Sequence, residues 1–144
     1  MIELSPKRRR ILQAVLYEFG AVALVAPTLG LVFGESAASS LSLAVVLSTV
    51  ALAWNYVFNA LFERWEARQS VRGRSWWRRL VHGVGFEGGL ATLLVPLMAW
   101  WLQISMFEAL LAELGFLVLF FVYAIVYTWS FDKVFGLPAS AAVR

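Results

Sequence analysis

The sequence has no cysteine, a single histidine and little charge. Without cysteine the chain can form no disulfide, no thiolate metal site and no thiol nucleophile. The one histidine, His82, makes neither a metal site nor a catalytic triad by itself. Only 15% of the residues are charged, against about a quarter in typical proteins, while 61% are hydrophobic. We therefore expect no metal, no cofactor and no enzymatic activity, and too little polar surface for a soluble domain.

Long hydrophobic runs account for this composition. Each is 22 or 23 residues long, and together they span residues 11–33, 41–62, 80–102 and 109–131. A helix needs about 20 apolar residues to cross the hydrocarbon core, and it satisfies its own backbone hydrogen bonds there. The runs are continuous and do not alternate, which argues against strands. The sequence thus predicts an all-α membrane protein with four transmembrane helices.

Positive charge is missing from two of the three predicted connections. Residues 34–40 and 103–108 contain no Lys or Arg, so all twelve basic residues fall in the N-terminal segment, the middle connection and the C-terminal segment. Cytoplasmic segments carry the excess of Lys and Arg, which predicts cytoplasmic N and C termini and a cytoplasmic middle connection. Anchoring to membrane lipid explains the basic middle connection, and we expect no nucleic-acid partner.

The sequence repeats with an offset of 69 residues. The residues that coincide at this offset are Arg10 with Arg79, Glu18 with Glu87, Gly20 with Gly89, Pro27 with Pro96, Trp54 with Tyr123, and Glu63 with Asp132. Each repeat contains two helices and starts from the same side of the membrane, so the repeats are parallel. We assign residues 1–69 to the first transmembrane-pair repeat, 70–78 to a basic cytoplasmic linker and 79–144 to the second repeat.

One glutamate stands at the same position in each repeat. Glu18 and Glu87 lie inside apolar runs, eight residues after Arg10 and Arg79. A charged carboxylate at mid-bilayer costs about 2.5–3.5 kcal/mol on insertion scales, and hydrocarbon favours the protonated acid. Such a group can exchange a proton for a cation. We predict a proton-coupling and substrate site at Glu18, with Glu87 as a second such site or a protonated hydrogen-bond donor. The alternative is two neutral acids that join neighbouring helices.

The second apolar run ends in a polar face beside an aromatic face. Asn55, Asn59 and Glu63 recur at every fourth position and therefore share one side of a helix. Aromatic rings attract organic cations, whereas amides in lipid also join helices to one another. Both interpretations stay open for the amides. Our candidates for a substrate path are Trp54, Asn55, Asn59, Tyr123 and Tyr127.

Three more acids lie at or near the ends of the apolar runs. Glu63 and Asp132 lie at the cytoplasmic ends of their runs. They are either carboxylates at the cytoplasmic entrance or ion-pair partners of Arg10 and Arg79, and we expect the ion pairs. Glu113 has no acidic counterpart in the first repeat. We expect it near the outer surface, in contact with solvent, with a role on the exit side as the alternative.

Four motifs in this sequence resemble those of the proteobacterial antimicrobial compound efflux family, whose members contain two bacterial transmembrane pair domains. They read R-I-L-Q-A-V-L-Y-E at 10–18, W-N-Y-V-F-N-A-L-F-E at 54–63, R-L-V-H-G-V-G-F-E at 79–87 and Y-A-I-V-Y-T-W-S-F-D at 123–132. Gln13 and Tyr17 replace the histidine and phenylalanine of the first motif, and Glu63 replaces an aspartate. A role for the first-motif histidine is therefore not carried over to Gln13.

The resemblance implies secondary active transport. It implies that this chain, like members of that family, exports cationic biocides, such as chlorhexidine and acriflavine-like dyes, or short diamines. Export is then across the bacterial inner membrane and in exchange for protons. The resemblance also implies Glu18 as the proton-coupling residue. The alternative function is a non-transporting membrane scaffold or assembly factor. Because four helices offer little protein to enclose a path, we further predict a homodimer, with the glycine-rich face of residues 83–89 as its contact.

Overall fold

The computed structural model describes residues 4–71, 73 and 75–137. Within these residues the chain forms helices only, in the order α1 (Pro6–Phe33), α2 (Ala37–Ala67), α3 (Trp76–Leu102) and α4 (Met106–Phe135). Each of them is long and apolar enough to cross a membrane. The predicted all-α fold with four membrane-spanning helices is confirmed.

A serine precedes every helix and caps it. The hydroxyl oxygens of Ser5, Ser36, Ser75 and Ser105 each accept a hydrogen bond from the backbone N–H three residues later. Helices α1 and α3 then begin before their apolar runs, and α2 and α4 continue beyond theirs. At these ends the helices continue through basic and aromatic residues that lie outside the apolar runs. Hydropathy alone therefore underestimates the helix lengths.

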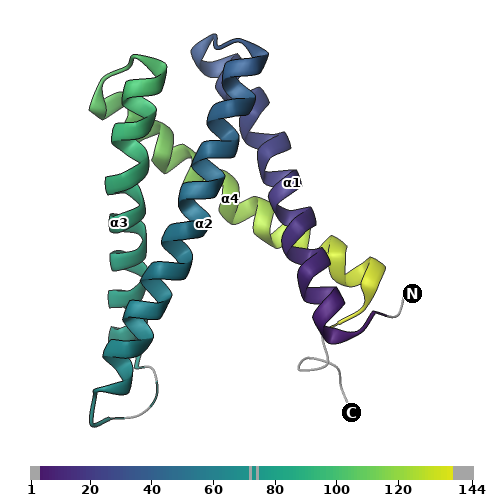
Figure 1. Cartoon of the computed structure of the whole chain (residues 1–144), viewed down its shortest axis with the longest axis vertical. Coiled ribbons are helices and arrows are strands. Elements are labelled where there is room, and N and C mark those ends of the chain that lie inside the picture. The colour runs from purple at the N-terminus through teal and green to yellow at the C-terminus, as the bar shows by residue number, and fades with distance from the viewer. Residues whose placement is uncertain (1–3, 72, 74, 138–144) are drawn as a thin grey trace.

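The connections divide the bundle into two ends. The α1–α2 and α3–α4 connections lie at one end, which we call the outer end (Figure 1). The α2–α3 connection lies at the opposite, inner end, together with the start of α1 and the end of α4 (Figure 1). Besides packing within its own repeat, α1 contacts α4 and α2 contacts α3. Each repeat therefore packs its first helix against the second helix of the other.

The main hydrophobic core fills the outer half of the bundle. Buried side chains from all four helices meet there, including Leu29, Leu43, Met98 and Ala109, each 0% exposed. Near the same end the Trp101 indole N–H donates to the Ser39 hydroxyl at 3.0 Å, which ties α3 to α2. Toward the inner end the helices separate into the pairs α1–α4 and α2–α3 (Figure 1). The outer end is thus closed by packing, and the inner half is built from two pairs.

The orientation of the bundle in the membrane stays a prediction. Arg72, Arg74 and Arg144, which contribute to it, lie outside the described residues. The remaining basic residues are in the first or last turns of helices at the inner end, or directly beside them. A cytoplasmic inner end follows from this distribution.

Single cysteines can test this orientation because the natural chain has none. Glu108 and Ser70 are both exposed, at the outer and inner ends respectively. We expect Glu108→Cys to react with a membrane-impermeant thiol reagent on intact cells, and Ser70→Cys to react only after the cells are opened. Labelling of Ser70→Cys on intact cells would reverse the orientation.

Candidate substrate-binding cavity

A cavity of about 380 Å³ lies between the four helices. Most of its wall is aliphatic or aromatic. Its polar lining within the described residues consists of Tyr17, Glu18, Ser48, Asn55, Glu87 and Glu113. No Lys, Arg or His is among these lining residues. Negative charge on the carboxylates is therefore neutralised only by protons or by a cation that enters the cavity.

Glu18 occupies the middle of its helix. Along a straight helix it lies about 18 Å from Pro6 and about 22 Å from Phe33. Its side chain is half-buried, and its Oε2 accepts a hydrogen bond from the Ser48 hydroxyl of α2. This contact holds the carboxyl group at the cavity wall, while the second carboxyl oxygen accepts no hydrogen bond from the residues that the structure describes.

Glu87 stands at the equivalent place in α3 but has different neighbours. The counterpart of Ser48 in the second repeat is Leu117, which offers no hydroxyl. Instead, Glu113 of α4 is close enough for its carboxylate to interact electrostatically with that of Glu87. The two repeats thus bring their common glutamate into one cavity with unequal surroundings.

Glu113 corrects the expectation from the sequence. We expected it in contact with solvent at the outer surface, but its side chain is only 8% exposed and lines the cavity. Helix α4 runs obliquely across the bundle (Figure 1), so a residue close to its outer end along the chain lies in the interior. The available signal was its place inside an apolar run, a position where acids are costly and often functional.

The carboxylates do not converge on one point. Within the part of the chain that the structure describes, no three acidic or histidine side chains are placed to hold one metal ion. The three carboxyl groups that line the cavity therefore do not form a metal site.

Two aromatic residues join the repeats by the same contact. The Trp54 indole N–H donates to the backbone carbonyl of Phe86 at 3.0 Å, and the Tyr123 hydroxyl donates to that of Tyr17 at 2.9 Å. Phe86 and Tyr17 are themselves equivalent in the repeat. Of the path candidates within the described residues, Asn55 lines the cavity, whereas Trp54, Asn59, Tyr123 and Tyr127 are absent from its lining. Trp54 and Tyr123 instead connect helices of different repeats.

Glycines make these contacts sterically feasible. A Cβ atom added at Gly89 would overlap the indole ring of Trp54, and one added at Gly20 would overlap the hydroxyl of Tyr123. Gly20 and Gly89 are repeat counterparts. The shared pattern of a glycine facing an aromatic ring therefore reflects close packing between α1 and α4 and between α2 and α3.

The same packing bears on the predicted dimer. A Cβ at Gly85 would lie 3.2 Å from the ring of Phe58, whereas Gly83 and Gly88 have open space beside them. Part of the glycine-rich face is thus covered within the chain, which leaves Gly83 and Gly88 for an outside contact. The homodimer itself stays a prediction.

The amide and histidine side chains connect α2 to α3. The Asn59 amide nitrogen donates to the backbone carbonyl of Asn55, at 2.8 Å. Its Oδ1 lies 2.8 Å from Nε2 of His82 on α3, a distance typical of a hydrogen bond. The His82 ring also packs edge-on against Phe58 and Phe62. Asn59 and His82 together connect α2 to α3 in the inner half of the bundle.

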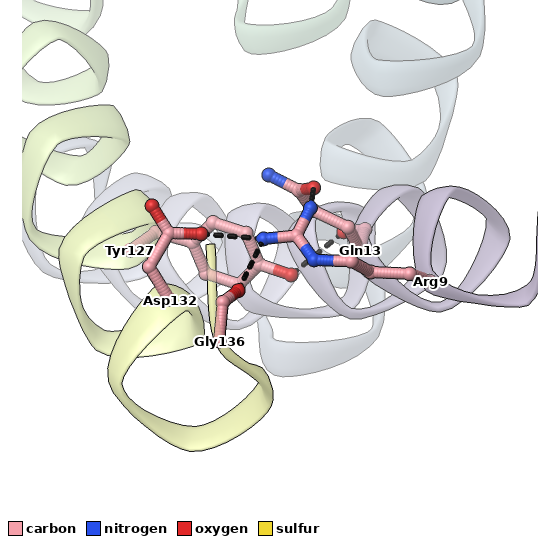
Figure 2. A network of polar contacts seen from close by, with 5 residues as sticks. All are labelled: Arg9, Gln13, Tyr127, Asp132 and Gly136. Atoms are coloured by element: carbon pink, nitrogen blue, oxygen red, sulfur yellow. Dashed lines mark hydrogen bonds and ion pairs between the residues drawn. The ribbon is translucent and has the colours of Figure 1, made fainter. Parts of the chain in front are cut away.

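Arg9 connects α1 to α4 (Figure 2), as Asn59 and His82 connect α2 to α3. Its guanidinium donates to Asp132 Oδ1 at 2.5 Å, to the Gly136 carbonyl at 2.9 Å and to Gln13 Oε1 at 3.2 Å. The Tyr127 hydroxyl donates to the backbone carbonyl of Gln13 at 2.6 Å. Figure 2 shows these groups meeting between the start of α1 and the end of α4. Arg9, directly before the first sequence motif, thus joins residues of the first and fourth motifs in one polar network.

The expected ion pairs with Arg10 and Arg79 are wrong. Asp132 pairs with Arg9, the preceding residue, and the side chains of Arg10 and Arg79 are exposed. Successive residues on a helix point about 100° apart, so Arg9 faces α4 while Arg10 does not. The repeat counterparts of this pair, Glu63 and Arg78, form no ion pair within the described residues.

A double-mutant cycle can measure what the Arg9–Asp132 pair contributes. The two side chains are 13% and 23% exposed, so the pair is partly shielded from solvent. We expect Arg9→Gln and Asp132→Asn to show a coupling of about 1–2 kcal/mol in thermal stability in detergent. Arg78→Gln with Glu63→Gln is the matched control from the other repeat, and its coupling should be close to zero. Equal couplings for the two cycles would contradict the structural difference between the inner ends.

Comparison with known proteins agrees with this architecture. A family model described as chlorhexidine efflux transporter, with the short name BTP, matches residues 5–68 and again residues 74–137. The chain is 39% identical to a short-chain diamines transporter of Vibrio parahaemolyticus over 128 residues, which cover 89% of this chain and 91% of that protein. It is 28% identical to the short-chain diamines transporter of Acinetobacter baylyi, over 88% of this chain and 89% of that one.

A further short-chain diamines transporter, from Acinetobacter baumannii, is 29% identical over 88% of each chain. No solved structure matches the chain significantly. The two family matches fall on α1–α2 and α3–α4, one for each pair of helices. The chain therefore belongs to the chlorhexidine efflux transporter family, the proteobacterial antimicrobial compound efflux transporters, and is a multi-pass bacterial membrane protein built from two tandem repeats.

Proposed function

We propose that this protein exports cationic, amphipathic biocides or short diamines across the bacterial inner membrane in exchange for protons, with Glu18 as the shared binding site. The observation that carries the proposal is the cavity, whose described lining contains Glu18, Glu87 and Glu113 and no basic residue. The relatives named as diamine transporters support the same class of substrate. A cavity of about 380 Å³ also falls in the usual range for small-molecule sites.

Competition for one carboxyl group is enough to couple the two fluxes. When the cavity faces the periplasm, a proton neutralises Glu18 and displaces the cation outward. When the cavity faces the cytoplasm, a new cation displaces the proton. Because proton and cation exclude each other at Glu18, the movement of one is thermodynamically linked to the movement of the other. No relay of further acids is required for this exchange.

The other motif residues take supporting roles in this proposal. Asn55 lines the cavity and is placed to contact the substrate. Trp54 and Tyr123 hold the pairs of helices together through their backbone hydrogen bonds. Glu87 contributes the second carboxyl group of the cavity. The Arg9–Asp132 network holds the inner ends of α1 and α4 together.

Inverted membrane vesicles with an imposed proton gradient test this function. Acid inside such vesicles drives an exporter to take up substrate, so we expect accumulation of a labelled diamine or cationic dye that a protonophore abolishes. Vesicles without the protein are the control. A non-transporting scaffold gives equal accumulation with and without the protein, and that result would overturn the proposal.

A further inference from the structure

Glu113 has no protein partner that explains its burial. Its side chain is 8% exposed and lines the cavity, yet no hydrogen bond to it is recorded within the described residues. Its carboxyl oxygens are not fully buried and so face the cavity, and an ionised acid within a membrane span is costly unless a cation neutralises it. The first repeat avoids this cost because Ala44 stands at the equivalent position and is itself buried. The second repeat therefore places an acid in the cavity wall where the first repeat places an alanine.

The neighbour of Glu113 across the cavity wall is also an acid. Glu87 and Glu113 are close enough to interact electrostatically. Two neighbouring carboxylates repel each other when both are ionised, so a cation placed between them is strongly favoured. The described lining supplies no Lys, Arg or His for this purpose. When the pair is ionised, the positive charge between the two carboxylates therefore comes from a ligand, and otherwise the pair holds a proton.

Glu18 is the third acid in the cavity lining. It belongs to the first repeat, where it bonds to Ser48, whereas Glu87 and Glu113 belong to the second. The three acids do not converge on a single metal-sized point. A cavity of about 380 Å³ has room for an alkyl chain of six or seven non-hydrogen atoms, which needs roughly half of it at about 30 Å³ per water-sized group. The arrangement suits an extended ligand with a charge at each end.

We propose that Glu113 is a specificity-determining residue that, with Glu87, binds the second ammonium group of a short alkyl dication whose first ammonium group is bound by Glu18. This inference rests on the proposed function and assigns the two ends of its binding site. A monocation uses the Glu18 end alone. Glu113 therefore discriminates diamines from monoamines of the same length, because only a diamine places a charge near it.

The test compares two ligands that differ in one ammonium group. Binding of 1,5-diaminopentane and of 1-aminopentane to the purified full chain in detergent is measured by calorimetry. We expect Glu113→Gln to weaken diamine binding roughly ten- to a hundredfold and monoamine binding by less than about threefold, because one charge-assisted hydrogen bond is lost. Glu108→Gln, an exposed acid in the first turn of the same helix, is the matched control and should change neither. An equal effect of Glu113→Gln on both ligands, or on neither, would overturn the assignment.

A second variant keeps the inference testable if glutamine disturbs the fold. Glu113→Asp retains the charge but withdraws it from the cavity by one methylene group. We expect the preferred diamine to become longer by about one methylene, and an unchanged preference among diamines of increasing length argues against a contact with Glu113. Glu18→Gln separates this question from the proposed function. Weaker binding of both ligands supports Glu18 as the common site, whereas unchanged binding of both refutes the proposed function whatever Glu113 does.

Discussion

Replacement of Glu18 by glutamine is expected to abolish export while leaving the fold intact. Glutamine is nearly isosteric with the protonated acid, and its carbonyl oxygen can still accept the hydrogen bond from the Ser48 hydroxyl. It can bind neither a proton nor a cation by charge. Cells producing Glu18→Gln should therefore be as sensitive to the exported cation as cells without the protein, with the variant present in the membrane in normal amounts.

The control for this experiment is a glutamate outside the cavity. Glu108 is exposed in the first turn of α4, so Glu108→Gln should leave resistance unchanged. Full resistance in Glu18→Gln would remove Glu18 as the coupling residue and would make Glu87, its repeat counterpart, the next candidate. Partial resistance with wild-type pH dependence would contradict the single-site exchange in the same way.

The second large effect is expected from a single methyl group at Gly89. The indole of Trp54 lies where the Cβ atom of an alanine would be, so Gly89→Ala forces the ring away and breaks its hydrogen bond to the Phe86 carbonyl. Overpacking typically costs about 1–3 kcal/mol and a lost hydrogen bond about 1 kcal/mol. We expect Gly89→Ala to destabilise the protein by about 2–4 kcal/mol, measured by thermal unfolding in detergent.

The same helix provides a matched control. Gly83 has open space where its Cβ would be, and alanine favours a helix by about 1 kcal/mol over glycine. Gly83→Ala should therefore leave stability unchanged or raise it slightly. Gly20→Ala should resemble Gly89→Ala because its Cβ would meet the Tyr123 hydroxyl. Equal stability of Gly83→Ala and Gly89→Ala would show that Trp54 does not pack on α3 as described.

The four helices and the repeat could be predicted because each depends on local features of the chain. Hydrophobic runs longer than about 20 residues mark spans, and the 69-residue offset aligns Glu18 with Glu87 without any knowledge of contacts. The predicted ends of the helices were less accurate, because the charged turns at the inner end are helical but not apolar. Pairing of helices between the repeats needs tertiary information that the hydrophobic pattern does not contain.

The errors at the site have geometric causes. Depth was counted along the chain, which placed Glu113 near solvent, but the oblique course of α4 brings it into the cavity (Figure 1). The ion pair was assigned to the motif residue Arg10, but the preceding residue, Arg9, is the one that faces α4 and pairs with Asp132. For Trp54 and Tyr123, the aromatic character was plain from sequence, but their hydrogen bonds to backbone carbonyls depend on which helices are neighbours.

The central claim is that a proton and a cation compete for Glu18, and the affinity for a singly charged cation measured across a range of pH tests it most directly. Because binding displaces a proton, affinity in the natural protein should rise with pH, by up to about tenfold per unit for one displaced proton. The Glu18→Gln variant should bind more weakly, through the aromatic and amide groups of the cavity, and lose this slope. The same slope in both proteins would contradict the account.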